Sequence, residues 1–148
     1  MDVFGRKIAK DYVSFREKPG TALEESVAEF LTAYLNDCNS RRMEKVAGYF
    51  TDDAIIDAKA LGSTVTKETY IKVMSAAIKD LFLFTLDQVA ITAENSDATA
   101  VRVSGVLTIS LGNRLPEQEF CVLHLKKSGT GWKINRTVLE SISKTKFT

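Results

Sequence analysis

Three side chains in this sequence have the chemistry of acid–base or hydrogen-bond catalysis: Tyr34, Asp57 and His124. A tyrosine hydroxyl in an apolar environment stabilises a developing oxyanion by donating a hydrogen bond to it. A carboxylate or an imidazole accepts a proton and returns it later in the reaction. In a catalytic interpretation, Tyr34 polarises a carbonyl group and Asp57 or His124 moves the proton.

Each of these side chains also has a structural interpretation. Tyr34 lies on an apolar helical stripe, where a core tyrosine finds a buried partner for its hydroxyl. His124 alternates with Leu123 and Leu125 along an expected strand, so it should point away from the core. Asp57 is out of phase with the core residues of its own strand, which predicts the outer face for it as well.

The composition gives little support for a metal site or for a reactive thiol. His124 is the only histidine, and Cys38 and Cys121 form no Cys-x-x-Cys motif, so a typical set of zinc ligands is lacking. Both cysteines fall on apolar faces and are expected to be buried thiols, with a disulfide or a redox pair as the alternative. Asp52 and Asp53 follow a predicted helix, where such residues bond to their own backbone more often than to a cation. The sequence therefore predicts no metal and no cofactor.

The charge balance limits the classes of partner. Among 148 residues, 20 are basic and 19 acidic, which gives a net charge of +1. Nucleic-acid-binding domains usually show a basic excess, so neither nucleic acid nor an anionic membrane is an expected partner. Residues 1–20 contain no continuous apolar stretch, which predicts neither an export signal nor a membrane span and favours a cytoplasmic location.

Apolar residues at steps of three and four predict helices in the first half of the chain. The first is an N-terminal extension over residues 1–20, in which Phe4, Ile8, Tyr12 and Phe15 share one face. A long helix over 22–38 follows, opened by a Thr21-to-Glu24 capping box. Two further helices are expected over 43–50, capped by Asn39-Ser40, and over 66–81, capped by Thr66.

The period of the apolar pattern changes to two after residue 81, which predicts strands. We expect a short strand over 54–58, a loop or hairpin arm over 62–65, and long strands over 82–91, 101–111, 120–127 and 132–141. A slip in the alternation at Asp87-Gln88 predicts a β-bulge, and Gly105 marks a sharp bend. Helices followed by strands are typical of an α+β domain with an antiparallel sheet, here over 21–142 with a frayed tail over 143–148.

The stretch from Ala22 to Ser141 resembles the nuclear-transport-factor-2-like superfamily, which includes ketosteroid isomerases and polyketide-cyclase-like enzymes. The similarity lies in the order of the elements and in three local marks: Tyr34-Leu35-Asn36, the run Val-Ala-Gly-Tyr-Phe-Thr-Asp-Asp-Ala over 46–54, and Gly131-Trp132-Lys133-Ile134. The resemblance implies a cone, in which three to four helices pack on a strongly curved antiparallel sheet and enclose a pocket.

Ketosteroid isomerases of this superfamily use a tyrosine on the first long helix and two acids on strands. Tyr34 falls on the tyrosine position, but Ala58 falls on that of the general base and Leu123 lies near that of the late acid. Asp57 is one residue early and should point to the opposite face. The resemblance therefore argues against steroid isomerisation by that mechanism.

The implied pocket is apolar, although its wall and the domain core are the same surface in such a cone. Its expected lining is Tyr34, Ile56, Tyr70, Met74, Val103, Leu123 and Trp132. On the outer sheet face, charged residues are few for a solvated strand, which is the composition of an interface core. Relatives often dimerise through this face, so a homodimer is expected through Arg102, Ser104, Val106, Phe120, Val122 and His124.

Three functions remain open at this stage. The first is a binding module that holds a small hydrophobic or aromatic ligand without chemistry. The second is an enzyme of the polyketide-cyclase, dehydratase or isomerase type, acting on a carbonyl substrate. The third is a protein-interaction domain that uses the sheet face or the N-terminal helix.

Overall fold

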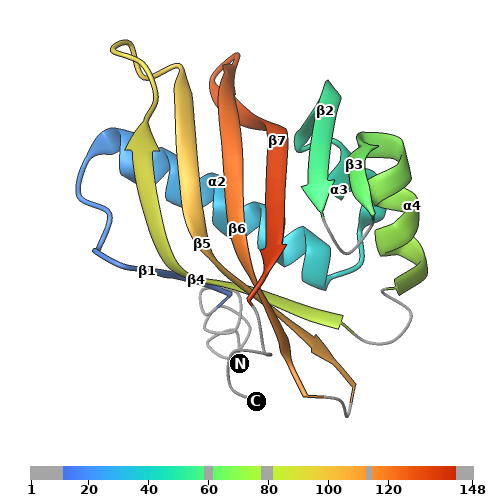
Figure 1. Cartoon of the computed structure of the whole chain (residues 1–148). Helices are drawn as coiled ribbons and strands as arrows, with labels where there is room; N and C mark the ends of the chain where they lie inside the picture. The colour runs from blue at the N-terminus through green and yellow to red at the C-terminus, as the bar shows by residue number, and fades with distance from the viewer. Residues whose placement is uncertain (1–11, 59–61, 78–81, 113–114, 143–148) are drawn as a thin grey trace.

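The computed structural model describes residues 12–58, 62–77, 82–112 and 115–142. In this part of the chain one mixed sheet is packed against helices α2 (Ala22–Asn39), α3 (Met43–Ala47) and α4 (Lys67–Ala77). Figure 1 shows α2 crossing behind the central strands, with α3 and α4 near the β2–β3 end of the sheet. The domain is α+β, as the sequence predicts.

Seven strands form the sheet in the described residues, in the order β1-β4-β5-β6-β7-β2-β3. Their bounds are β1 (Val13–Phe15), β2 (Phe50–Ala58), β3 (Ser63–Thr66), β4 (Phe82–Ala93), β5 (Ala100–Leu111), β6 (Glu117–Ser128) and β7 (Gly131–Ser141). The strands from β4 to β7 pair in antiparallel fashion, as expected. The sheet as a whole is mixed, because β1 runs parallel to β4 and β2 runs parallel to β7.

The predicted N-terminal helix is wrong where the structure describes it. Val13–Phe15 is a strand, and the amide of Leu86 donates to the Tyr12 carbonyl at 2.7 Å. Apolar steps of three and four residues favour a helix, so pairing with the distant β4 overrides the local pattern here. The remainder of that predicted helix, over 1–11, and the predicted tail over 143–148 lie outside the described residues.

The long helix begins as its sequence indicates. Thr21 accepts a hydrogen bond from the Glu24 amide at 3.0 Å, and the Glu24 side chain accepts one from the Thr21 amide at 3.2 Å. The predicted capping of α3 by Asn39-Ser40 is wrong. Asn39 is buried and its amide group bonds both ways to the backbone of Phe84 in β4, at 2.7 and 2.9 Å.

Two bulges set which side chains face the helices. The pairing register between β4 and β5 shifts after Asp87, and Gln88 has a φ of 56°. The predicted bulge is therefore confirmed. A second shift lies in β7 between Ile134 and Arg136. Because of it, Trp132 and Ile134 are buried before the shift and Thr137 and Leu139 after it.

The core lies between the concave face of the sheet and the helices. Its most completely buried large side chains include Phe50, Leu31, Ile56, Leu86 and Leu125. Of the helices in the described ranges, none is long and apolar enough to cross a membrane.

Candidate functional site

A small cavity opens between the helices and the concave face of the sheet. Its volume is about 30 Å³. That is room for roughly two water molecules. The wall consists of Tyr34, Leu35, Cys38, Tyr70, Met74, Phe84, Leu86, Leu107, Cys121, Leu123, Thr137 and Leu139.

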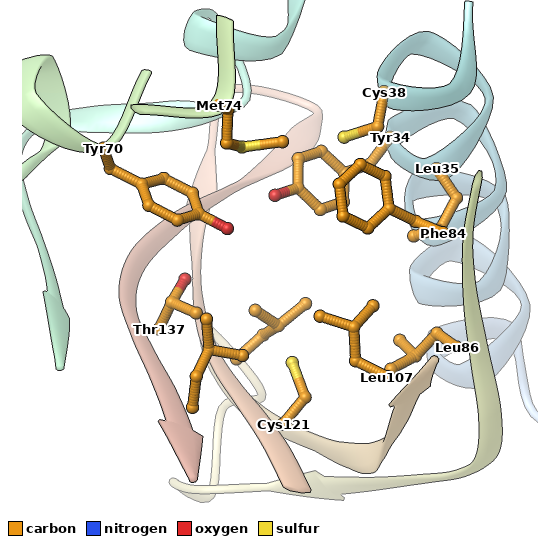
Figure 2. A pocket seen from close by; sticks show the side chains of 12 residues that line it. Tyr34, Leu35, Cys38, Tyr70, Met74, Phe84, Leu86, Leu107, Cys121 and Thr137 are labelled. Carbon is orange, nitrogen blue, oxygen red and sulfur yellow. The ribbon is translucent and has the colours of Figure 1, made fainter. Parts of the chain in front are cut away.

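Three hydroxyl groups face this cavity from three different elements. Figure 2 shows the hydroxyl oxygens of Tyr34 on α2, Tyr70 on α4 and Thr137 on β7 directed toward the same space. The opposite side of the wall is formed by Leu86, Leu107 and the thiol of Cys121. The cavity therefore has a polar end and an apolar end.

Stacked and edge-on aromatic rings hold the two tyrosines in place. The ring of Tyr34 lies 5.4 Å from that of Tyr49 and 5.9 Å from that of Phe50, and Phe50 lies 6.2 Å from Tyr70. Tyr49 is itself anchored, since its hydroxyl donates to buried Asp37 at 2.6 Å. Asp37 also pairs with Arg42 at 3.1 Å. This network fixes the positions of the hydroxyls in the cavity.

Thr137 is the unusual member of the hydroxyl group. Its side chain is only 3% exposed. Among buried side-chain nitrogen and oxygen atoms of the described residues, its Oγ1 is the one that lacks a hydrogen-bond partner. An unpaired buried hydroxyl costs about 1–3 kcal/mol, so such groups are rare in a core without a function.

Burial keeps the polar wall of the cavity protonated at neutral pH. It raises the pKa of the Tyr34 and Tyr70 hydroxyls well above their ordinary value. It also raises the pKa of the Cys38 and Cys121 thiols to about 12. Among the described residues that line the cavity there is no carboxylate and no histidine, so this part of the wall offers hydrogen-bond donors and no base.

The predicted lining residues divide into two groups. Tyr34, Tyr70, Met74 and Leu123 lie in the wall of the cavity. Ile56, Val103 and Trp132 do not, because they are buried in the core away from it. Trp132 packs instead beneath the first turns of α2, where its Nε1 donates to Ser26 at 3.1 Å.

Two of the three catalytic candidates lie outside the cavity. Asp57 bonds to Arg136 Nε at 2.8 Å and also accepts a hydrogen bond from Thr64, on the outer sheet face. His124 is partly exposed and lies 3.3 Å from the Glu94 carboxylate. The expectation that Asp57 or His124 moves a proton beside Tyr34 is therefore wrong, and the strand alternation that argues against it is the reason.

The residues of the predicted dimer face share the outer surface of β5 and β6. Phe120 is 54% exposed, which is unusual for a phenylalanine in the centre of a sheet. Its strand neighbours on this face are partly buried or exposed, with Arg102, Ser104 and Val106 on β5 and Val122 and His124 on β6.

The model of the SnoaL-like domain family matches residues 21–138, which is most of the chain. The chain belongs to the SnoaL-like domain family. This confirms the superfamily resemblance, since SnoaL-like domains are of the nuclear-transport-factor-2-like kind. No curated protein matches this SnoaL-like domain at a significant level.

Solved structures share the fold of this SnoaL-like domain at low sequence identity. A candidate calcium/calmodulin-dependent protein kinase II association domain from Xanthomonas campestris superposes with a TM-score of 0.75 at 13% identity, covering 90% of this chain and 97% of its own. Aln2 from a Streptomyces species gives 0.69 at 18% identity, covering 84% and 94%. A candidate scytalone dehydratase from Novosphingobium aromaticivorans gives 0.64 at 16% identity, covering 80% and 83%.

One ionisable residue near the cavity of this SnoaL-like domain is absent from the sequence-based candidates. Glu119 is partly buried on β6, in phase with Cys121 and Leu123 of the cavity wall. Burial, and then the charge of Glu117, raise the pKa of its carboxyl group. The predicted strand begins at residue 120, so Glu119 lies outside it. Extending the alternation of Cys121 and Leu123 by one step places it on the inner face.

Proposed function

We propose that the protein binds a small apolar molecule whose single oxygen, a carbonyl or a hydroxyl, contacts Thr137 and the tyrosine hydroxyls. The support is the unpaired hydroxyl of Thr137, directed into an otherwise apolar cavity beside Tyr34 and Tyr70. A carbonyl oxygen has two lone pairs and accepts from two of these donors at once. A ligand oxygen at this point removes the cost of the unpaired group.

The size of the cavity limits what can enter. Ligand sites for drug-sized molecules usually enclose about 300–1,000 Å³, far more than this cavity offers. Met74 is an unbranched side chain in the wall, and methionine adapts readily to a new neighbour. Any ligand larger than about two water molecules, a small cyclic ketone included, therefore requires Met74 to move.

The test compares ligands that differ only in the oxygen. Cyclohexanone and methylcyclohexane have similar size and shape, and their binding to the full chain is measured by chemical-shift changes of the protein methyl groups. We expect cyclohexanone to bind more tightly, and Thr137→Val to weaken its binding about tenfold while leaving the hydrocarbon unaffected. Equal binding of the two compounds, or no binding of either, would sink the proposal.

Glu119 supports a second candidate function, proton transfer on a carbonyl ligand. The tyrosine hydroxyls remain protonated and suit the stabilisation of an enolate oxygen, while the Glu119 carboxylate takes a proton from the adjacent carbon. A protein with this activity exchanges the protons next to the carbonyl of cyclohexanone for deuterium in D₂O. Glu119→Gln should abolish that exchange, and exchange no faster than in protein-free buffer would exclude this function.

A further inference from the structure

The rim of the cavity holds a carboxyl group that has no counter-charge among the described residues. Glu119 lies opposite Leu107 of β5, a wall residue, and opposite Ser141 of β7. It precedes Cys121 by two residues on the same face of β6, which places it next to two wall residues, Leu107 and Cys121, on the side where β6 leaves the core. Figure 2 shows the thiol of Cys121 directed from β6 into the cavity.

Nothing in the described part of the chain compensates this carboxyl group. The Glu119 carboxylate makes no hydrogen bond or ion pair with a residue in the ranges 12–58, 62–77, 82–112 and 115–142. The group that acts on it most after burial is another carboxylate, Glu117, on the same strand. Its own charge acts on Tyr70 of α4 and on Cys121, both of which line the cavity.

A partly buried carboxylate without a partner is unfavourable, and a second carboxylate beside it makes it more so. A cation at this point offsets both effects. An anion is repelled by Glu119 and Glu117 together. A second observation, independent of Glu119, indicates that a ligand binds in the cavity. Thr137 is 3% exposed, its hydroxyl lacks a partner among the described residues, and it is directed into the cavity.

We propose that the ligand bears a cationic group, such as an ammonium, that pairs with Glu119 at the rim while its apolar body and oxygen enter the cavity. This inference rests on the proposed binding function and adds the charge of the ligand to it. Glu119 then acts as a specificity-determining residue, which admits neutral and cationic molecules and rejects carboxylates. Because the cavity has a volume of about 30 Å³, the apolar body enters only where Met74 moves aside.

Three probes with the same carbonyl end and different charges test the inference. They are 4-(aminomethyl)acetophenone, 4-methylacetophenone and 4-acetylbenzoate, titrated into the full chain at pH 7 and followed by calorimetry. We expect the amine to bind about tenfold more tightly than the methyl compound, and the carboxylate to bind most weakly. Lowering the pH through the pKa of Glu119, which lies above the ordinary 4.5, should remove the preference.

Two variants separate Glu119 from its neighbour. Glu119→Gln should make the affinities of the three probes equal, and it should fold normally because it removes an uncompensated charge. Glu117→Gln changes an exposed carboxylate on the same strand and should retain most of the preference. Equal affinities in the unmodified chain, or a preference that survives Glu119→Gln, would overturn the inference while leaving binding intact. Failure of all three probes to bind would remove the binding function and this inference with it.

Discussion

At the scale of single residues, the unpaired hydroxyl of Thr137 lowers the stability of the protein, whereas in the proposed function it contributes to ligand binding. A valine has nearly the same shape and would fill the same space without leaving a hydroxyl unpaired. We expect Thr137→Val to raise the free energy of unfolding by about 1–2 kcal/mol in chemical denaturation. The same substitution should weaken ketone binding, so stability and binding should move in opposite directions.

Thr137→Ser is the matched control for that variant. It keeps the hydroxyl and removes a buried methyl group, so it should destabilise the protein by about 1 kcal/mol and retain ketone binding. Loss of stability in Thr137→Val would mean that the hydroxyl has a partner in solution, and the case for a ligand at that point would lapse.

Asp57 gives a residue-scale prediction about pH. The hydrogen bond from Thr64, and then Arg136, lower the pKa of its carboxyl group. A group whose pKa is lower in the folded state stabilises the protein above its unfolded value, and this contribution disappears as the pH falls through the folded value. Asp57→Asn should therefore reduce stability at pH 7 and have little effect once the pH lies below the folded pKa.

The control for this variant is Asp97→Asn, in an exposed turn. Removal of that charge should leave the unfolding midpoint unchanged at both values of pH. A constant effect of Asp57→Asn across the pH range would show that its contacts do not depend on ionisation.

At the scale of elements, the β4–β5 bulge depends on a glycine. A Cβ at position 105 would lie 2.9 Å from the carbonyl oxygen of Asp87, which is backbone and cannot easily move. Gly105→Ala should therefore destabilise the protein by about 1–3 kcal/mol, as overpacking usually does. Thermal unfolding measures the effect.

Gly131 is the matched site for that substitution, since nothing lies within 4 Å of a Cβ built there. Gly131→Ala should be neutral or slightly stabilising, because alanine loses less backbone entropy on folding. Equal effects at the two positions would mean that the bulge adapts, and the close approach at Gly105 would then have no energetic weight.

Elements that follow from local pattern could be predicted from the sequence. The capping box at Thr21, the cap at Thr66 and the bulge at Asp87-Gln88 each have a short-range signal, and all three are present. β1 and the start of β2 at Phe50 have none, because both depend on parallel pairing with distant strands. Such pairing overrides the local preference that predicts a helix and a turn there.

Only part of the candidate site could be predicted from the sequence, because the rest depends on how distant strands pair. Tyr34 and Tyr70 stand out on helical stripes, but Thr137 reaches the inner face through the shift in β7. The sequence does hold a hint of that shift. Unbroken alternation from Trp132 and Ile134 would place Arg136 in the core, which an unpaired charge does not tolerate. A change of phase before Arg136 avoids this and turns Thr137 inward.

At the scale of the whole molecule, the outer sheet face has a polar row at one end and an exposed apolar ring toward the other. The polar row crosses three strands with Arg102, His124 and Arg136 side by side, where His124 lies 3.3 Å from Glu94 and Arg136 pairs with Asp57. The row four residues along β6 is apolar and acidic, with Asp87, Val106, Phe120 and Glu140. Between them lie Ser104, Val122 and Val138.

We propose that a second copy of the chain covers this face, turned end over end so that the Arg102 row of each copy meets the Phe120 row of its partner. A two-fold axis in the plane of the interface and across the strands produces this arrangement, which is the usual symmetry of homodimers. The exposed ring of Phe120 then packs near His124 of the partner subunit. An exposed aromatic ring among apolar and small polar side chains is the composition of an interface core.

Phe120→Lys tests the arrangement. It places a positive charge opposite the Arg102 row of the partner subunit and removes the exposed apolar ring, so we expect a dimer in sedimentation equilibrium for the unmodified chain and a monomer for the variant. Val73→Lys is the control, since Val73 is a similarly exposed apolar residue on α4, away from the sheet face. A monomeric unmodified chain, or dissociation by both variants alike, would contradict the arrangement. Because Thr137 lies on the opposite face of the sheet, Phe120→Lys should also leave ketone binding unchanged, which separates assembly from the cavity.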